Sequence, residues 1–317
     1  MHTYLDFEAQ VAEFEAKIAE LKALSADDPA MAIEEEVRQL ERKAAKSLAE
    51  LYARLDPWQK TQVARHPHRP HFMDYVKSLF TGFTPLAGDR KFGDDRSILG
   101  GPAWFNGEPV MVIGQEKGHD TQARIAHNFG MALPEGYRKA VRLMEMAERF
   151  GLALISFIDT PGAYPGIGAE ERGQSEAIAR SIDCGLGLTV PSIAVIIGEG
   201  GSGGAVALAA ANRVMMLEHA IYSVISPEGA ASILWRDSNK AEDAAVALKI
   251  TAADLLQFRV IDEIIPEPMG GAHRDAEQMI AATGKAIAAG FLLLKGLDPE
   301  ETRRHRREKF LAIGRAF

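Results

Sequence analysis

A glycine-rich segment at residues 198–204, with the sequence Gly-Glu-Gly-Gly-Ser-Gly-Gly, is the stretch of this chain best suited to chemistry. It follows an apolar, β-branched run at 191–197 and precedes an alanine-rich stretch at 205–211, which predicts a strand, a tight turn and a helix. Glycines expose backbone N–H groups, and a helix N-terminus adds partial positive charge at the same place. The segment is therefore predicted to bind something negative, either a phosphate or an oxyanion.

A second turn of similar composition lies upstream, at residues 159–166, with the sequence Asp-Thr-Pro-Gly-Ala-Tyr-Pro-Gly. It also follows a predicted buried strand, at 152–158. Two such turns at the ends of neighbouring strands could present N–H groups to one cavity, which is how an oxyanion hole is built. Little nearby looks like a side-chain nucleophile, and the lone Cys184 falls in a predicted helix as a core residue. The two turns favour a chemistry in which main-chain amides stabilise an enolate-like anion.

A dinucleotide-binding interpretation of the same segment competes with this one. Gly198-x-Gly200-x-x-Gly203 matches the dinucleotide fingerprint, and the acidic Glu218 follows about twenty residues later. An NAD-binding oxidoreductase is therefore the alternative function. It is disfavoured because the segment comes late in the chain, after at least two strand–helix units, and carries extra glycines. A nucleotide-binding P-loop is excluded because no Lys-Ser or Lys-Thr follows the glycines. A tight packing turn without a ligand is the remaining alternative.

Two further clusters have charged or metal-ligating side chains. Three histidines, His66, His68 and His71, lie in a proline-stiffened segment, but no carboxylate or cysteine sits at a spacing that fits a metal site. We therefore expect a surface or interface segment there. A basic run at 303–307, Arg-Arg-His-Arg-Arg, is expected to be the solvated end of a helix, with a docking patch for an acidic partner as the alternative.

The composition limits the class of protein. The chain has 317 residues, 47% hydrophobic content and a net charge of −8, which argues against a general binder of nucleic acid or anionic membranes. The single cysteine rules out a disulfide within the chain and a zinc cluster made of cysteines, and it fits a reducing cytoplasm. No secretory signal is expected at the N-terminus, and the longest apolar stretch, at 186–197, is too short to span a bilayer.

The predicted elements give an α/β layered fold between two helical ends. Apolar residues at heptad-like spacing predict two antiparallel N-terminal helices, the second starting near Asp28 and Pro29, which should pack on the main domain or on another chain. Residues 57–100 are expected to be loop-rich. The predicted strands lie at 109–114, 152–158, 191–197, 214–217, 221–225 and 260–265. The predicted helices lie at 134–150, 170–184, 205–211, 227–235, 241–250, 253–258 and from about 275 onward.

Over nearly its full length the chain resembles the alpha-subunit family of the bacterial acetyl-coenzyme A carboxylase carboxyltransferase. The most specific matches are Phe-Ile-Asp-Thr-Pro-Gly-Ala-Tyr-Pro-Gly at 157–166 and Glu-Glu-Arg-Gly-Gln-Ser-Glu-Ala-Ile-Ala-Arg at 170–180. The glycine-rich segment also matches, as do shorter stretches at 93–95, 109–114, 128–131, 134–140, 222–229 and 264–268. Small departures at 182–184 and 230–231 touch neither glycine turn.

The resemblance implies an α/β crotonase-like (ClpP/crotonase) fold, a superhelix of ββα units. It suggests an N-terminal helical hairpin at 1–56, a carboxyltransferase domain at 57–270 and a C-terminal helical segment at 271–317. The implied reaction moves a carboxyl group from carboxybiotin, on the biotin carboxyl carrier protein, to acetyl-CoA. The product is malonyl-CoA, in the first committed step of fatty acid biosynthesis.

The resemblance also implies partners and a compartment. The chain would be active only with a zinc-ribbon-bearing beta subunit, as an α2β2 heterotetramer, and would work with the carrier protein and with biotin carboxylase. Carboxybiotin on the separate carrier is the implied cofactor, and no metal is expected in this chain. The implied compartment is the cytoplasm, and neither a membrane nor a nucleic acid is an expected partner.

Site residues follow from the resemblance together with the two turns. Backbone N–H groups are expected to stabilise the negative charge on the ureido oxygen of biotin, and the freed biotin nitrogen could take the acetyl proton. The expected donors are Gly203, Gly204 and Ala205, with Gly162 or Ala163. The expected substrate-binding residues are Gly200, Gly201, Ser202, Tyr164, Pro165 and Gly166.

Overall fold

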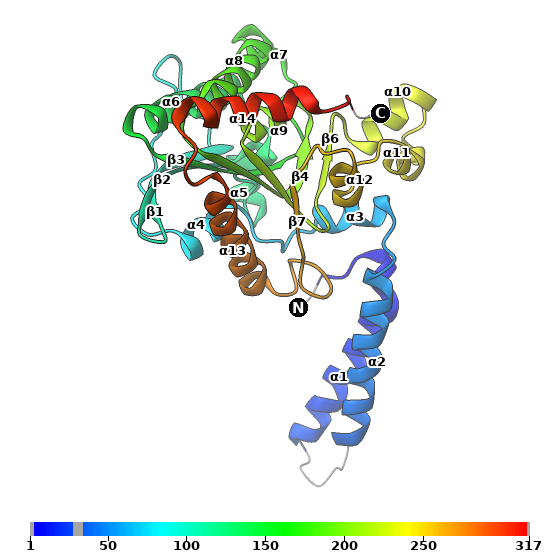
Figure 1. The fold of residues 1–317 in the computed structure, drawn as a ribbon. Helices are drawn as coiled ribbons and strands as arrows, with labels where there is room; N and C mark the ends of the chain where they lie inside the picture. Colours follow the sequence, from blue (N-terminus) through cyan, green and yellow to red (C-terminus); the bar gives the residue numbers. More distant parts are fainter. Residues whose placement is uncertain (1–2, 28–33, 316–317) are drawn as a thin grey trace.

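The computed structural model describes residues 3–27 and 34–315, which form a layered α/β body with a long helical hairpin projecting from it (Figure 1). Within these residues a seven-stranded sheet has the order β1-β2-β3-β4-β5-β7, and β6 pairs with β4. The strands are β1 (Ile98–Phe105), β2 (Glu108–Gln115), β3 (Ala153–Thr160), β4 (Ser192–Gly201), β5 (Arg213–Leu217), β6 (Ile221–Ser223) and β7 (Glu263–Ile265). β1 and β2 are antiparallel, and the other pairs are parallel.

The central strands are buried on both faces, which explains their continuous apolar sequences. Every residue of β4 is buried, and all of β3 except its first residue is buried. β4 has different neighbours along its length, because residues 193–196 pair with β5 while residues 199–201 pair with β6. The last strand residue of β3, Thr160, pairs with Gly200 after a register shift. The ends of β3 and β4 therefore lie side by side.

Helices cover the sheet, and their ends follow local signals in the sequence. α6 (Pro134–Phe150) starts with a proline and ends at Gly151 in the left-handed conformation, as predicted. It packs against α8 (Gln174–Gly187), which in turn packs against α9 (Ser202–Ala209). The other helices are η1 (Asp6–Glu8), α1 (Ala9–Asp27), α2 (Glu34–Tyr52), α3 (Pro57–Ala64), α4 (Phe72–Leu79), α5 (Thr121–Ala126), η2 (Asn128–Gly130), α7 (Ile167–Glu171), α10 (Pro227–Trp235), η3 (Ser238–Lys240), α11 (Ala241–Ala247), α12 (Ala252–Gln257), α13 (Ala276–Leu294) and α14 (Pro299–Ala312).

Three predictions of secondary structure were wrong. Residues 57–100 contain two helices, α3 and α4, where loops were expected. The helix expected at 170–184 is interrupted, because Gly173 adopts a left-handed φ of 80° between α7 and α8. The strand expected to end at residue 197 continues to Gly201, since the backbone of the glycine-rich segment pairs with β6.

The N-terminal hairpin of α1 and α2 extends away from the body (Figure 1). Its outer part has a small core of its own, built around Ile18, Val37 and Ala44. Only its base touches the body, where Tyr52 stacks edge-on against His219 and where Arg274 pairs with Glu15 at 2.7 Å. The predicted helix start at Asp28 and Pro29 lies outside the described residues.

The C-terminal helices α13 and α14 pack on the body. α13 is the one described helix that is long and apolar enough to cross a membrane by length and composition. Its inner face packs on the sheet, since a Cβ at Gly290 would lie 2.6 Å from the side chain of Met215. In the basic run, Arg306 is fully buried and donates to the carbonyl oxygens of Leu188 and Val190 at 2.6 and 2.9 Å. The run is therefore not wholly a solvated helix end.

Candidate functional site

The two predicted turns meet at the ends of β3 and β4. A Cβ placed on Gly201 would lie 2.2 Å from the carbonyl oxygen of Pro161, and one on Gly204 would lie 2.8 Å from the nitrogen of Ala163. Real Cβ atoms essentially never approach other atoms this closely. Glycine at 201 and 204 is therefore required for the two backbone segments to touch. The sequence predicts that both turns face one place, and the structure brings them together.

The start of α9 has several amides without an acceptor inside the helix. The first four N–H groups of a helix, counted from its N-cap, have no acceptor inside the helix, and here the N-cap is Gly201. Ser202, Gly203 and Gly204 follow it, and the first two are only half-buried. Ala205 is the fourth helical residue, so its N–H is the first with an acceptor within the helix. The expectation that Ala205 would donate to a ligand is corrected for this reason.

The two predicted donors in the turn after β3, Gly162 and Ala163, differ in their hydrogen bonds. The N–H of Gly162 donates to the hydroxyl oxygen of Thr160 at 3.1 Å, so it is not available to a ligand, contrary to one of the two predicted alternatives. The next amide, that of Ala163, makes no hydrogen bond within the described residues, whereas the N–H of Tyr164 donates to the carbonyl oxygen of Ala132 at 3.0 Å. Of the two predicted alternatives, Ala163 is therefore the one whose amide is available to a ligand.

Several predicted substrate-binding residues are placed away from the open side. Gly200 and Gly201 are buried strand residues paired with Tyr222 and Ser223, so their expected role as an open binding surface is corrected. The ring of Tyr164 folds back over Gly166, where a Cβ would lie 2.3 Å from the tyrosine ring. Pro165, in the same turn, is exposed.

Ser202 has features that the sequence analysis missed. Residues 200–204, Gly-Gly-Ser-Gly-Gly, have the Gly-x-Ser-x-Gly spacing of a nucleophile elbow, which was a readable signal. The structure places Ser202 between a strand and a helix with a left-handed φ of 55°. Within the described residues, however, its hydroxyl makes no hydrogen bond to a histidine or carboxylate. Since an activated serine requires such a base, the geometry gives no support to a nucleophile.

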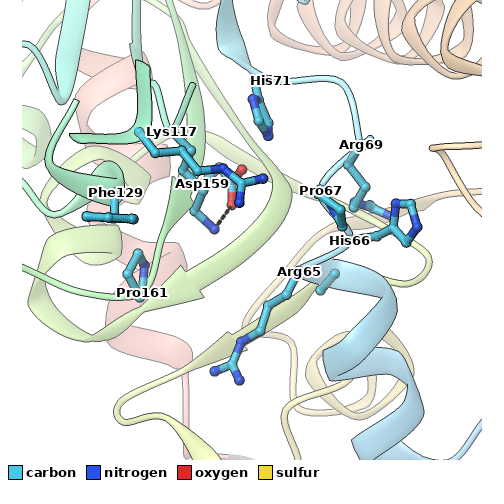
Figure 2. Close-up of a pocket in the computed structure, with 11 residues that line it drawn as sticks. Arg65, His66, Pro67, Arg69, His71, Lys117, Phe129, Asp159 and Pro161 are labelled. Atoms are coloured by element: carbon cyan, nitrogen blue, oxygen red, sulfur yellow. Dashed lines mark ion pairs between the residues drawn. The ribbon is translucent and has the colours of Figure 1, made fainter. Parts of the chain in front are cut away.

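A cavity of about 190 Å³ lies beside the turns, between the segment at 64–71 and the ends of β2 and β3. Figure 2 shows Phe129 and Pro161 on one side of it and His66 and Arg69 on the other, with Lys117 paired to Asp159 between them. Lys117 follows β2, and Asp159 is the second-last residue of β3. Their positions at the carboxyl ends of parallel strands could have marked them as site residues in the sequence.

Charged side chains around this cavity, some buried and some half-buried, are matched in pairs. The ammonium nitrogen of Lys117 lies 2.7 Å from Asp159 and 3.7 Å from Glu199. The guanidinium of Arg65 lies 2.6 Å from Glu199 and 2.6 Å from Glu228. Burial alone would lower the pKa of Arg65, but these two carboxylates raise it above its ordinary value. The cluster holds the end of β4 rigidly against the segment after α3.

Of the three histidines, only His68 is exposed, and His66 and His71 are buried, so the expectation of a surface segment is wrong for these two. The rings of His66 and His68 lie 5.5 Å apart. His66 stacks on His273 with a ring distance of 3.8 Å, and its Nδ1 accepts the backbone N–H of His68 at 3.2 Å. His71 instead stacks on His119 at 4.4 Å. Burial lowers the pKa of His273 to about 3, so it is neutral at pH 7. Residues 3–27 and 34–315 contain no cluster of three or more side chains that could hold a metal ion.

The glycines of the dinucleotide fingerprint do not have the conformation that dinucleotide binding requires. Its first two glycines, Gly198 and Gly200, lie within β4, whereas the fingerprint requires them in a turn between a strand and a helix. The carboxylate of Glu218 accepts the backbone N–H of Glu267 at 3.1 Å, so it is occupied within the fold. The NAD-binding alternative is therefore wrong about the conformation of this segment.

Comparison with known sequences decides the family. A sequence model described as "acetyl co-enzyme A carboxylase carboxyltransferase-like" matches residues 4–314. The chain is also 66% identical, over 317 residues and the whole of both chains, to the acetyl-coenzyme A carboxylase carboxyl transferase subunit alpha of Azorhizobium caulinodans. The chain belongs to this carboxyltransferase family, as an alpha subunit. A second family member, the alpha subunit of Methylobacterium sp., is 67% identical over 315 residues and 99% of each chain.

Solved structures of other carboxyltransferase-like proteins share the fold. A chain of the Pseudomonas malonate decarboxylase hetero-tetramer in complex with coenzyme A aligns with a TM-score of 0.59 and 18% identity, covering 73% of this chain and 90% of that one. Transcarboxylase 12S aligns with a TM-score of 0.58 and 19% identity, covering 71% of this chain and 41% of that one. The prediction of a crotonase-like α/β fold for this family member is confirmed.

Proposed function

We propose that the chain transfers a carboxyl group from carboxybiotin, carried by a separate biotin carboxyl carrier protein, to acetyl-CoA. The product is malonyl-CoA, for fatty acid biosynthesis. The proposal rests on family membership and, in the structure, on one observation. The free amide of Ala163 lies against the start of α9, where the amides of Ser202, Gly203 and Gly204 have no acceptor in the helix. Carboxybiotin supplies the activated carboxyl group, whose release leaves negative charge on the ureido oxygen.

The amides of this chain stabilise that negative charge. Ala163 donates from one side, and Gly203 and Gly204 donate from the other, where the dipole of α9 adds to the effect. Loss of one donor from an oxyanion hole typically raises the barrier by about 3 kcal/mol. No described side chain here combines the geometry of a nucleophile with that of its base. The chain therefore contributes electrostatic stabilisation, while the substrates carry the reacting bonds.

The residues present fit a flat, uncharged ring such as the ureido ring of biotin. Gly203 has no side chain, and a Cβ there would meet only the side chain of Ile178, at 3.3 Å. Ser202 and Gly203 are half-buried, so their backbone is reachable from solvent. A ring can therefore approach the amides closely, as an oxyanion-hole contact requires.

A beta subunit that covers this face is part of the proposal, in an α2β2 assembly that works with biotin carboxylase. Large apolar side chains around the site are exposed, which is unusual for a surface that faces only water. They are Ile125, Phe129, Ile167 and Val224, with exposed fractions between 49% and 79%. The beta subunit would hold acetyl-CoA and its thioester enolate and would carry the zinc ribbon.

We also propose the domain limits at residues 56 and 270 and a cytoplasmic location, which the half-buried, free Cys184 suits.

Substitution of Gly204 in a co-expressed alpha–beta pair tests the function. Gly204→Val places atoms within 2.8 Å of the Ala163 nitrogen and 2.9 Å of the Tyr137 hydroxyl, so it must separate the two turns. We expect the rate of malonyl-CoA formation to fall at least about a hundredfold, with the heterotetramer still formed. Gly187→Ala is the control, because a Cβ there meets nothing within 4 Å. Wild-type rates in the Gly204→Val pair would contradict the proposal.

A further inference from the structure

A buried glutamine connects the two turns that form the proposed oxyanion hole. Gln115 is the last residue of β2 and is fully buried. Its side-chain nitrogen donates to the carbonyl oxygen of Gly204 at 2.8 Å, and its side-chain oxygen accepts the backbone N–H of Asp159 at 3.1 Å. One carboxamide therefore joins the first turn of α9 to the end of β3.

The chemistry of the two partners fixes how this carboxamide is oriented. A backbone carbonyl can only accept and a backbone N–H can only donate, so the nitrogen must face Gly204 and the oxygen must face Asp159. An apolar side chain of the same length could make neither bond. Glutamine therefore holds both backbone segments at once from a single rigid, planar group.

We propose that Gln115 is a positioning residue, which sets the distance between the amide of Ala163 and the amides at the start of α9. This inference rests on the proposed function. The donors of an oxyanion hole act over a narrow range of 2.7–3.1 Å, and a misplacement of about 1 Å can cost a hundredfold in rate. Gln115 reaches the site through Gly204 and Asp159, with no contact to a ligand.

A change in the distance between the two turns should affect the stabilisation of the reacting atoms and little else. The ureido oxygen gains its negative charge on the way to the transition state, so the spacing of the amides affects the transition state more than substrate binding. Loss of Gln115 should therefore lower kcat and leave the KM values nearly unchanged. A residue that only stabilises the fold would lower the melting temperature without such a split.

The test compares two variants of the alpha chain, each co-expressed with its beta subunit. Gln115→Met keeps the size of the side chain and removes both hydrogen bonds. Ser156→Ala is the matched control, because the buried Ser156 hydroxyl on β3 also bonds to α9, donating to the carbonyl of Leu208 at 2.8 Å, but at the far end of that helix. The measurements are kcat, KM for both substrates, and the melting temperature.

We expect Gln115→Met to lower kcat by about 10- to 100-fold, with both KM values within about threefold of wild type. Ser156→Ala should lower the melting temperature by a similar amount and leave kcat within about twofold. If Gln115→Met does not assemble, Gln115→Asn serves instead, since its carboxamide is one methylene shorter and cannot reach both Gly204 and Asp159; the same loss of kcat is expected.

Two outcomes would overturn the inference, and they are distinguishable. A wild-type pair that is active, with kcat unchanged in Gln115→Met or Gln115→Asn, rejects the positioning role alone. An equal loss of kcat in Ser156→Ala rejects the positioning role as well, because the loss of kcat would then result from lower stability in general. A wild-type pair without carboxyl-transfer activity rejects the proposed function, and this inference with it.

Discussion

At the scale of single residues, the candidate site depends on atoms that the sequence does not distinguish. Gly162 and Ala163 are neighbours in one turn, yet the amide of the first is bonded to Thr160 and that of the second makes no hydrogen bond to a described residue. Gly204 and Ala205 differ in the same way, because only the second lies far enough into α9 to find a helical acceptor. The sequence was enough to place the proposed oxyanion hole at two turns. The individual amide donors could be assigned only from the hydrogen bonds in the structure.

The charge balance beside the site gives a prediction for Lys117. Lys117→Met removes the ion-pair partner of the buried Asp159, close to the turn where an anion forms, while Glu199 keeps its pair with Arg65. We expect a loss of about 3 kcal/mol in the free energy of unfolding and a reduction in kcat of about tenfold. Urea denaturation and steady-state kinetics of the alpha–beta pair measure the two effects.

Lys46→Met is the control for this substitution. Lys46 is also paired with a carboxylate, that of Glu50 at 3.8 Å, but its side chain is 78% exposed. Such a surface pair contributes little, so both stability and kcat should stay near wild type. Equal effects of the two substitutions would contradict a special role for the buried charge cluster.

At the scale of elements, the sequence correctly predicted the ends of helices that are set by the local backbone chemistry of one or two residues. α6 and α10 begin and end as predicted, because each starts with a proline and stops at a left-handed residue. β4 was cut short in the prediction because glycines are poor strand formers, and only pairing with β6 keeps residues 199–201 extended. α3 and α4 were missed because each has only eight residues, although Phe72, Tyr75 and Val76 of α4 recur at helical spacing and were a readable signal.

The basic run on α14 gives a prediction at this scale. Arg306 is buried and bonds to the carbonyls of Leu188 and Val190 and to the side chain of Asn212 at 2.5 Å, so it holds the link between α8 and β4. Arg306→Met leaves the buried carbonyls of Leu188 and Val190 without this donor, while the side-chain oxygen of Asn212 still accepts from Ser192. We expect a loss of about 3 kcal/mol in the free energy of unfolding, measured by urea denaturation. Arg307→Met, at an exposed position of the same run, should change it by less than about 0.5 kcal/mol.

At the scale of the whole molecule, one buried ion pair joins distant parts of the chain. Arg69, near the N-terminal side of the body, lies 2.7 Å from Glu267, which follows β7, and its guanidinium also donates to the carbonyl of Ile197 in β4 at 2.9 Å. Both charged side chains are almost completely buried. Burial alone would raise the pKa of Glu267, but Arg69 and the surrounding hydrogen bonds lower it from 4.5 to about 2.

The pKa of Glu267 predicts how stability depends on pH. Because the folded pKa lies below the unfolded one, the unfolded state binds more protons between these values, and the stabilisation present above pH 4.5 is lost as the pH falls towards 2. The contribution is about 3 kcal/mol. Glu267→Gln should destabilise the protein at pH 7 and flatten its stability profile between pH 4.5 and 2. An unaltered profile in urea titrations over this range would contradict the assignment.

The projecting hairpin has a consequence for how the molecule moves in solution. Each of its helices has 19 residues, which corresponds to a rod about 28 Å long, and its outer part rests on no other element of the described chain. A particle with such an arm meets more drag than a sphere of the same mass. The chain should therefore sediment more slowly and tumble more anisotropically than its 34.5 kDa alone would give.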